Sequence, residues 1–175
     1  LENGDLDGGL NDLFTLAVHF LELHETGVGK QILDRIVQLA PTDLDKRLRV
    51  GRCLERSALE EDAFRSYVEL ARDLGRQNQL DAAQAICEEA RRLRPLDPET
   101  LELRIQTHLA MRQKAEAIEA CREVARAHLA NNDYQGAEEA LRSAIRFAEF
   151  DAAMSPNRQL LLAADMQFEL LNDHL

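Results

Sequence analysis

An internal repeat of 54 residues is the feature that most limits what this 175-residue chain can fold into. Residues 62–97 align without a gap on residues 116–151, and nine of the 36 aligned positions are identical. The apolar positions keep the same phase throughout. Such a repeat indicates stacked copies of one structural unit, because a single copy cannot bury its apolar face alone. The identical pairs are Ala63/Ala117, Glu69/Glu123, Ala71/Ala125, Arg72/Arg126, Asn78/Asn132, Ala83/Ala137, Ala90/Ala144, Arg92/Arg146 and Asp97/Asp151.

A second, shorter spacing lies inside the repeat. Small residues recur at alternating steps of 34 and 20 residues, which add to 54. We interpret this alternation as a unit of three helices, in which each small residue sits near a helix start and lets a neighbouring helix approach closely. These residues are Gly29, Ala63, Ala83, Ala117 and Ala137.

The composition supports an all-α fold. Ala, Leu, Arg and Glu are abundant and are strong helix formers, and 45% of the residues are hydrophobic, which is enough for a core. Thr42 with Asp45, Asp97 before Pro98, and Ser155 before Pro156 resemble helix N-terminal signals. The predicted helices are 9–25, 28–40, 43–57, 59–76, 79–94, 98–112, 114–131, 133–149 and 156–172. Their connections are short, so consecutive helices are expected to pack antiparallel.

Several residues match the pattern of the tetratricopeptide repeat (TPR) family, which this chain resembles over nearly its whole length. In the first 34-residue unit the matching residues are Leu13, Leu16, Ala17, Phe20, Gly29, Leu33, Ile36 and Pro41. The next unit begins at Leu44. The resemblance implies a right-handed α-solenoid of antiparallel helical hairpins with about nine helices. It departs from the family pattern in its 20-residue steps and in lacking the usual aromatic residue at position 4.

Charge and motifs exclude several functions. The net charge of −11 gives no overall attraction to nucleic acid or to an anionic membrane. No stretch of about 18 apolar residues occurs, so we expect no membrane insertion. The cysteines, Cys53, Cys87 and Cys121, have no metal-binding spacing and are expected to be free and buried in a reducing, cytoplasmic location. We find no catalytic or metal-ligating constellation, so we expect neither enzyme activity nor a cofactor.

The densest cationic cluster lies in the helix that begins at Leu44. Arg49, Arg52 and Arg56 are spaced i, i+3, i+7 and therefore share one helix face. The TPR resemblance implies that this face lines a concave binding groove. Guanidinium groups recognise carboxylates, so an acidic peptide is the expected ligand. The alternative is a solvated face paired with neighbouring acids, namely Asp45, Glu55 and Asp62.

The first helix carries more apolar residues than one core face requires. Leu13, Leu16, Ala17 and Phe20 suffice for the core, and Phe14, Val18 and Leu21 form a second apolar stripe. The predicted helix 156–172 has a similar excess of apolar residues. We expect Phe14, Val18 and Leu21 to anchor a partner helix on the groove side. The alternatives are further core within the chain, or burial against another copy.

The sequence as a whole predicts a protein-interaction module or scaffold that binds an acidic peptide or an amphipathic helix. The predicted organisation is one repeat domain, residues 9–175, after a disordered or tag-like start, residues 1–8. Two alternatives remain open: a homo-oligomerisation module that uses apolar terminal helices, and a ligand-sensing helical domain. The style of the sequence is typical of bacterial proteins.

Overall fold

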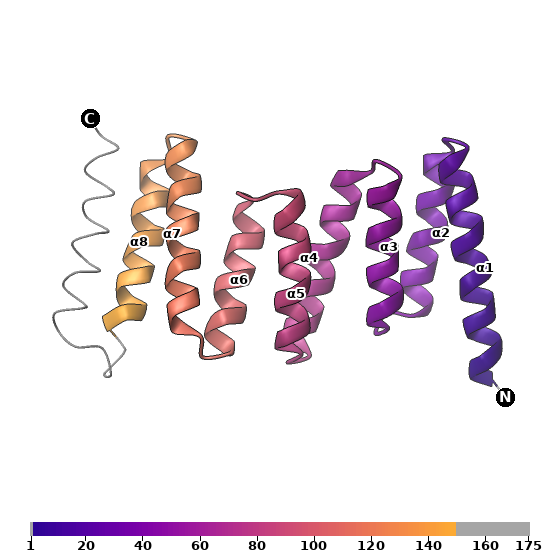
Figure 1. Ribbon diagram of the computed structural model, residues 1–175, viewed down its shortest axis with the longest axis horizontal. Helices are drawn as coiled ribbons and strands as arrows, with labels where there is room; N and C mark the ends of the chain where they lie inside the picture. Colours follow the sequence, from indigo (N-terminus) through magenta and orange to yellow (C-terminus); the bar gives the residue numbers. More distant parts are fainter. Residues whose placement is uncertain (1, 150–175) are drawn as a thin grey trace. The chain divides into compact units, whose positions relative to one another are not determined.

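A computed structural model describes residues 2–149 of the chain, and Figure 1 follows them in chain order. Within this range the structure has eight α-helices and no strand. The all-α prediction is therefore confirmed, and the predicted helix 156–172 lies outside the described residues. The helices are α1 (Glu2–Glu22), α2 (Thr26–Leu39), α3 (Leu44–Arg56), α4 (Glu60–Arg76), α5 (Leu80–Leu93), α6 (Pro98–Ala110), α7 (Lys114–Ala130) and α8 (Tyr134–Glu149).

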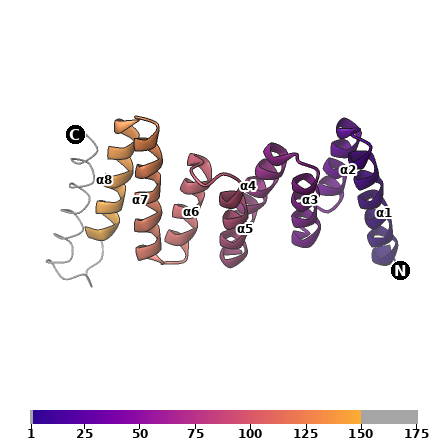
Figure 2. The ribbon, with the colours of Figure 1, turned by 45° about the horizontal axis from the view of Figure 1, so that its top comes forward.

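The chain divides into two compact units, and the boundary lies inside α4, between Leu70 and Ala71. The first unit holds α1, α2, α3 and most of α4. The second holds the last part of α4 and the helices α5 to α8. In the second unit α7 packs along α8, and the two lie side by side in Figures 1 and 2. Each unit is described below by itself.

The helix boundaries repeat with the 54-residue period of the sequence. Adding 54 to the bounds of α2, α3 and α4 gives the bounds of α5, α6 and α7 at both ends. The end of α1 and the start of α8 obey the same offset relative to α4 and α5. The repeating unit is thus three helices long. We call α2–α4 the first copy and α5–α7 the second copy.

One type of turn joins five of the helix pairs. Each contains a non-glycine residue with a positive φ near 60°, and at Asn78 the next N–H, that of Gln79, donates to the carbonyl of Leu74 at 2.9 Å. This left-handed C-terminal turn satisfies carbonyls that a helix end leaves unpaired. The five residues are His24, Ala58, Asn78, Arg112 and Asn132, and they are spaced 34, 20, 34 and 20 apart.

The recurring small residues lie five positions after these turns, and all five are buried. At Gly29 an added Cβ would lie 2.6 Å from Cγ of Leu21 and 3.3 Å from the carbonyl oxygen of Ala17. The absence of a side chain therefore allows α2 to approach α1. This confirms the expected role of the small residues at helix starts.

The remaining two connections each contain a proline and end in an aspartate that caps the next helix. The N–H of Lys46 donates to Asp43, and the N–H of Thr100 donates to Asp97, both at 3.0 Å. The prediction for Asp97 is confirmed. The predicted cap at Thr42 is wrong, because the chain stays extended for one more residue and Asp43 provides the capping oxygen.

Helix α1 differs from the prediction in its start and in its buried face. It begins at Glu2 rather than at residue 9, so residues 2–8 are helical rather than a disordered start. Phe14 is 1% exposed and Leu21 is 5% exposed, whereas Leu16, predicted to be in the core, is 44% exposed. The buried face is one position out of phase with the predicted one, because the face that holds Ala17 and Leu21 is the one that meets Gly29.

Candidate functional site

A hollow of about 600 Å³ lies between α1 and α3, within the first unit. We call it the basic hollow. It brings together five of the six residues that the sequence predicted for a partner site, the exception being Leu21, which is in the core. The lining residues are Phe14, Val18, Glu22, Asp45, Leu48, Arg49, Arg52, Cys53, Arg56 and Ser57.

Arg49 is fixed at the wall of the basic hollow by two interactions. Its guanidinium carbon lies 4.2 Å from the centroid of the Phe14 ring. Its Nη1 donates a hydrogen bond to Oδ1 of Asn11 at 2.8 Å. A guanidinium over an aromatic face is held by the negative charge of the ring face. Phe14 therefore acts through Arg49, and its buried ring is not itself an exposed anchor.

Arg52 and Arg56 are exposed, and neither guanidinium has an ion pair or hydrogen bond among residues 2–149. The acids expected to neutralise them are engaged elsewhere or stand apart. Asp62 pairs with Lys30 Nζ at 2.6 Å, and Glu55 accepts a hydrogen bond from the hydroxyl of Tyr67 at 3.3 Å. Two guanidinium groups four residues apart on one helix are therefore available to a ligand.

The two other cations of this segment stabilise the fold. Lys46 pairs with Asp43 at 2.6 Å and with Asp7 at 2.8 Å, and these acids raise the pKa of Lys46. Its hydrogen bonds in turn hold the pKa of Asp43 below its usual value. Arg47 is buried, and its Nη1 donates to the carbonyl of Pro41 at 3.3 Å. The cationic cluster seen in the sequence thus divides into a structural part and an available part.

The rest of the basic hollow is apolar or acidic. Val18 is 39% exposed and, with the half-buried Leu48, provides an apolar wall. Glu22 and Asp45 also line the hollow, so three cations face two carboxylates there. The site therefore has a small positive excess in a chain of net charge −11. A ligand that fits it has both apolar and acidic groups.

Cys53 is the one cysteine in the lining of the basic hollow. Burial raises the pKa of its thiol, and the nearby charges of Arg49 and Arg56 offset part of that rise. The arginines remain charged at any physiological pH. The groups that surround the hollow are thus suited to binding an anion rather than to moving a proton.

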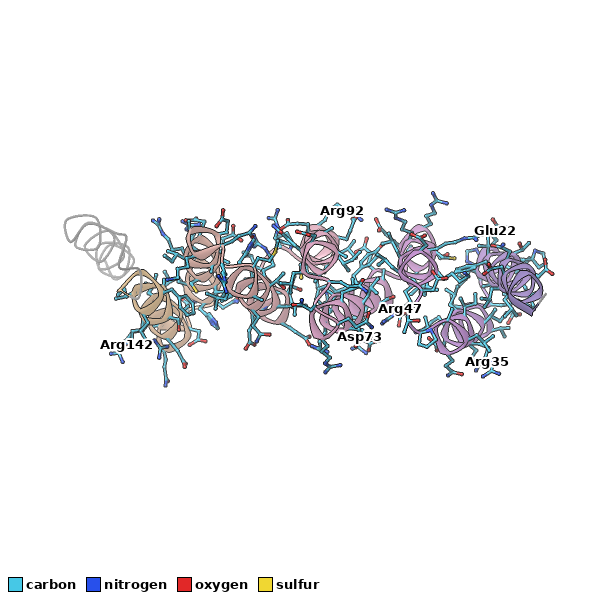
Figure 3. The ribbon with its side chains drawn as sticks, turned by 90° about the horizontal axis from the view of Figure 1, so that it is seen from below. Glu22, Arg35, Arg47, Asp73, Arg92 and Arg142 are labelled. Atoms are coloured by element: carbon cyan, nitrogen blue, oxygen red, sulfur yellow. The ribbon has the colours of Figure 1, made fainter. Side chains whose placement is uncertain are left out.

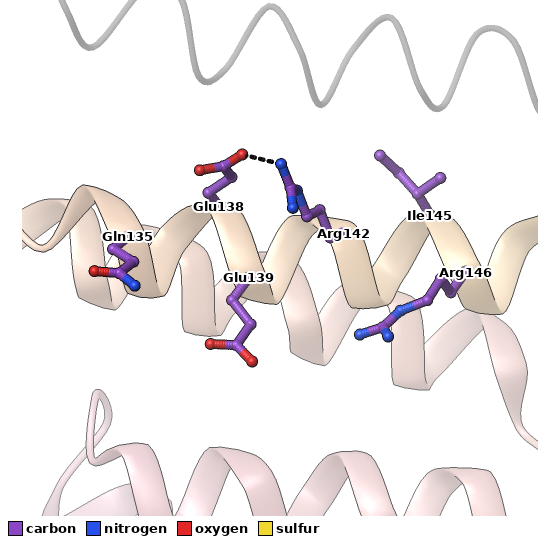
Figure 4. Close-up of a pocket in the computed structure, with 6 residues that line it drawn as sticks. All are labelled: Gln135, Glu138, Glu139, Arg142, Ile145 and Arg146. Atoms are coloured by element: carbon purple, nitrogen blue, oxygen red, sulfur yellow. Dashed lines mark hydrogen bonds and ion pairs between the residues drawn. The ribbon is translucent and has the colours of Figure 1, made fainter.

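The second unit has hollows of different chemistry. One, of about 670 Å³, lies among α6, α7 and α8 and has an apolar lining that includes Ile105, Val124 and Phe147. Another runs along α8 and is shown in Figure 4. There the cations are already engaged, because Arg142 pairs with Glu138 at 2.5 Å and Arg146 donates to the Ser143 hydroxyl at 2.9 Å. Neither offers a pair of available guanidinium groups.

No protein-family model matches the chain, and a search of curated proteins finds no match either. Within residues 2–149 no group of three or more His, Cys, Asp or Glu side chains is placed to hold a metal ion. None of the helices in that range combines the length and apolar character needed to span a bilayer. The assignment of a function therefore depends on the geometry of the hollows.

Proposed function

We propose that this chain is a TPR-like protein-interaction module, a right-handed stack of helical hairpins, that binds an acidic amphipathic segment of another protein in the basic hollow. The observation that supports the proposal is the pair of exposed, unengaged guanidinium groups of Arg52 and Arg56 beside an apolar wall. Carboxylates of the segment pair with these arginines, and its apolar side packs on Val18 and Leu48. Arg49 contributes charge from its fixed position over Phe14.

The same proposal places the protein in a reducing compartment, the cytoplasm. All three cysteines are free, and burial raises the pKa of Cys87 and of Cys121 to about 11. Buried, unpaired thiols are typical of proteins that are not exposed to an oxidising environment. The proposal assigns no reaction to the hollow, because its most numerous charged groups are arginines, which do not exchange protons near neutral pH.

A labelled helical peptide with one stripe of leucines and one of glutamates tests the proposal, with its glutamine counterpart as the uncharged reference. Fluorescence anisotropy measures binding to the wild type and to Arg49→Glu/Arg52→Glu/Arg56→Glu. We expect the triple substitution to weaken binding about tenfold or more, since each ion pair contributes about 0.5 kcal/mol. Added salt is expected to weaken the wild-type complex, because exposed charges are screened.

The matched control has the same change of charge on other helices: Arg35→Glu/Arg76→Glu/Arg146→Glu. These three side chains are exposed, and Arg35 projects outward from α2 in Figure 3. Equal binding by the control and the charge-reversed variant, or equal binding of the two peptides, would rule the proposal out. Light scattering at two concentrations separates the self-assembly alternative, which the exposed Leu16 and Leu23 of α1 would serve.

A further inference from the structure

The second copy of the repeat contains a guanidinium held between two carboxylates. Arg104 of α6 lies between Glu88 of α5, whose Oε1 is 3.1 Å from Nε, and Glu123 of α7, whose Oε2 is 2.5 Å from Nη1. The Arg104 side chain is only 12% exposed. Three helices therefore meet around one buried cation, and the two acids compensate for its burial.

The first copy has the two acids without the cation. The positions 54 residues earlier are Asp34 in α2, Val50 in α3 and Glu69 in α4. Val50 is buried and apolar, so no side chain extends from α3 to the two carboxylates. Asp34 and Glu69 are exposed, and neither has an ion pair or hydrogen bond among residues 2–149. The guanidinium position of the second copy is thus vacant in the first.

A hollow occupies this position. Its volume is about 370 Å³, it lies within the first unit, and both Asp34 and Glu69 line it together with the buried Val50 and Leu33. We call it the acidic hollow. Its volume falls at the low end of the range of about 300–1,000 Å³ for ligand pockets, so it suits one side chain rather than a folded element.

The cations that border the acidic hollow already have partners. Lys30 pairs with Asp62 at 2.6 Å, Arg65 pairs with Glu61 at 2.9 Å, and Arg47 donates to a backbone carbonyl. The charges left without a partner around the hollow are those of Asp34 and Glu69, both negative. The electrostatic demand of the hollow is therefore for a cation, as in the second copy.

We propose that the acidic hollow receives the guanidinium group of an arginine side chain from a partner polypeptide. The planar fork of a guanidinium can reach two carboxylates at once, as Arg104 does, whereas the single ammonium of lysine is a point charge. The apolar floor at Val50 and Leu33 accommodates the methylene stem. This site is independent of the basic hollow, because it shares no lining residue with it.

Titration of the full chain, labelled with ¹⁵N, tests the proposal by chemical-shift changes. The probes are acetyl-Gly-Arg-Gly-amide, the same peptide with citrulline, and free L-arginine. We expect the arginine peptide to shift amide signals around residues 34 and 69, and the citrulline peptide to leave them unchanged. Asp34→Asn/Glu69→Gln is expected to weaken binding of the arginine peptide about tenfold.

Two further variants use the repeat itself as a control. Val50→Arg fills the acidic hollow from within and should abolish binding of the peptide there. Arg104→Val empties the second copy and should create a new response around residues 88 and 123. Equal shifts with citrulline, or unchanged binding by the double variant, would overturn the proposal. Tighter binding of free L-arginine than of the peptide would replace the partner side chain by a small-molecule ligand.

Discussion

The helices α3 and α6 occupy the same place in the two copies of the repeat but present opposite chemistry. Both begin after a proline turn with a capping aspartate, and both are 13 residues long. The exposed face of α3 is cationic and that of α6 is neutral, because Arg49, Arg52 and Arg56 correspond to Leu103, Gln106 and Ala110. The repeat therefore maintains turns and caps, and its remaining surface positions vary with function.

The partner helices of this face differ in the complementary way. Arg72 of α4 forms an ion pair with Glu99 of α6 in the second unit. The residues 54 positions earlier are Val18 and Asp45, which cannot form such a pair and which both line the basic hollow. An ion pair thus closes in the second unit what a valine leaves open in the first. This difference explains why the basic hollow has no counterpart around the Arg72–Glu99 pair.

The largest effect is expected where the two copies exchange small and large core residues. Gly51 packs on the ring of Tyr67, and an added Cβ would lie 2.9 Å from both Cδ1 and Cζ. The equivalent pair in the second copy is Ile105 with Cys121. Gly51→Ile is expected to lower the free energy of unfolding by about 3 kcal/mol, since the buried ring cannot move away. Urea denaturation followed by circular dichroism measures this loss.

The compensating variant makes the comparison quantitative. Gly51→Ile/Tyr67→Cys installs the pair of the second copy in the first, and we expect the two substitutions to couple favourably by about 2 kcal/mol. The reciprocal Ile105→Gly/Cys121→Tyr provides the matched control in the second unit. Additive losses in both units would show that the two pairs are not packing equivalents.

Much of the fold could be predicted from the sequence, because its determinants are local. The 34- and 20-residue steps are visible as small residues, and they correspond to the turns at residues such as Asn78 and Asn132. The phase of α1 could not be predicted from hydropathy, since Leu13 and Leu16 on one stripe compete with Phe14 on the other. The deciding contact is nonlocal: Gly29 on α2 accepts the face of α1 that includes Leu21.

The basic hollow was partly visible and the acidic hollow was not. Arginines at i, i+3 and i+7 mark one helix face regardless of context, so Arg52 and Arg56 could be selected from spacing alone. Exposed acids such as Asp34 and Glu69 are common on helices and carry no such signal. Their significance depends on the vacant place between them, which is apparent only beside the ion pairs of Arg104 in the second copy.

A smaller effect is expected from converting the basic hollow into its counterpart. Val18→Arg places a cation opposite Asp45, as Arg72 stands opposite Glu99. We expect a gain of about 0.5 kcal/mol in unfolding free energy, typical of an exposed ion pair. The same change removes apolar contact and should weaken binding of the glutamate peptide severalfold. Val18→Leu is the control, and equal binding by the two variants would refute a role for the apolar wall.

The smallest effect concerns the thiols, and it changes a rate rather than stability. Iodoacetamide reacts with thiolates, and a pKa of about 11 leaves about one thiol in a thousand ionised at pH 8 for Cys87 and Cys121. Cys53 is 8% exposed at the wall of the basic hollow, whereas the other two are almost fully buried. We expect mass spectrometry to find alkylation of Cys53 first.

Saturation with the glutamate peptide should slow that reaction, because the peptide covers the hollow, and the glutamine peptide should not. The two buried thiols of the second unit provide the internal reference, since their rates depend only on opening of the fold. Faster alkylation of Cys121 than of Cys53 would mean that the second unit opens more readily than the basic hollow admits a small reagent. The contrast between a closed second unit and an open first one would then have to be reversed.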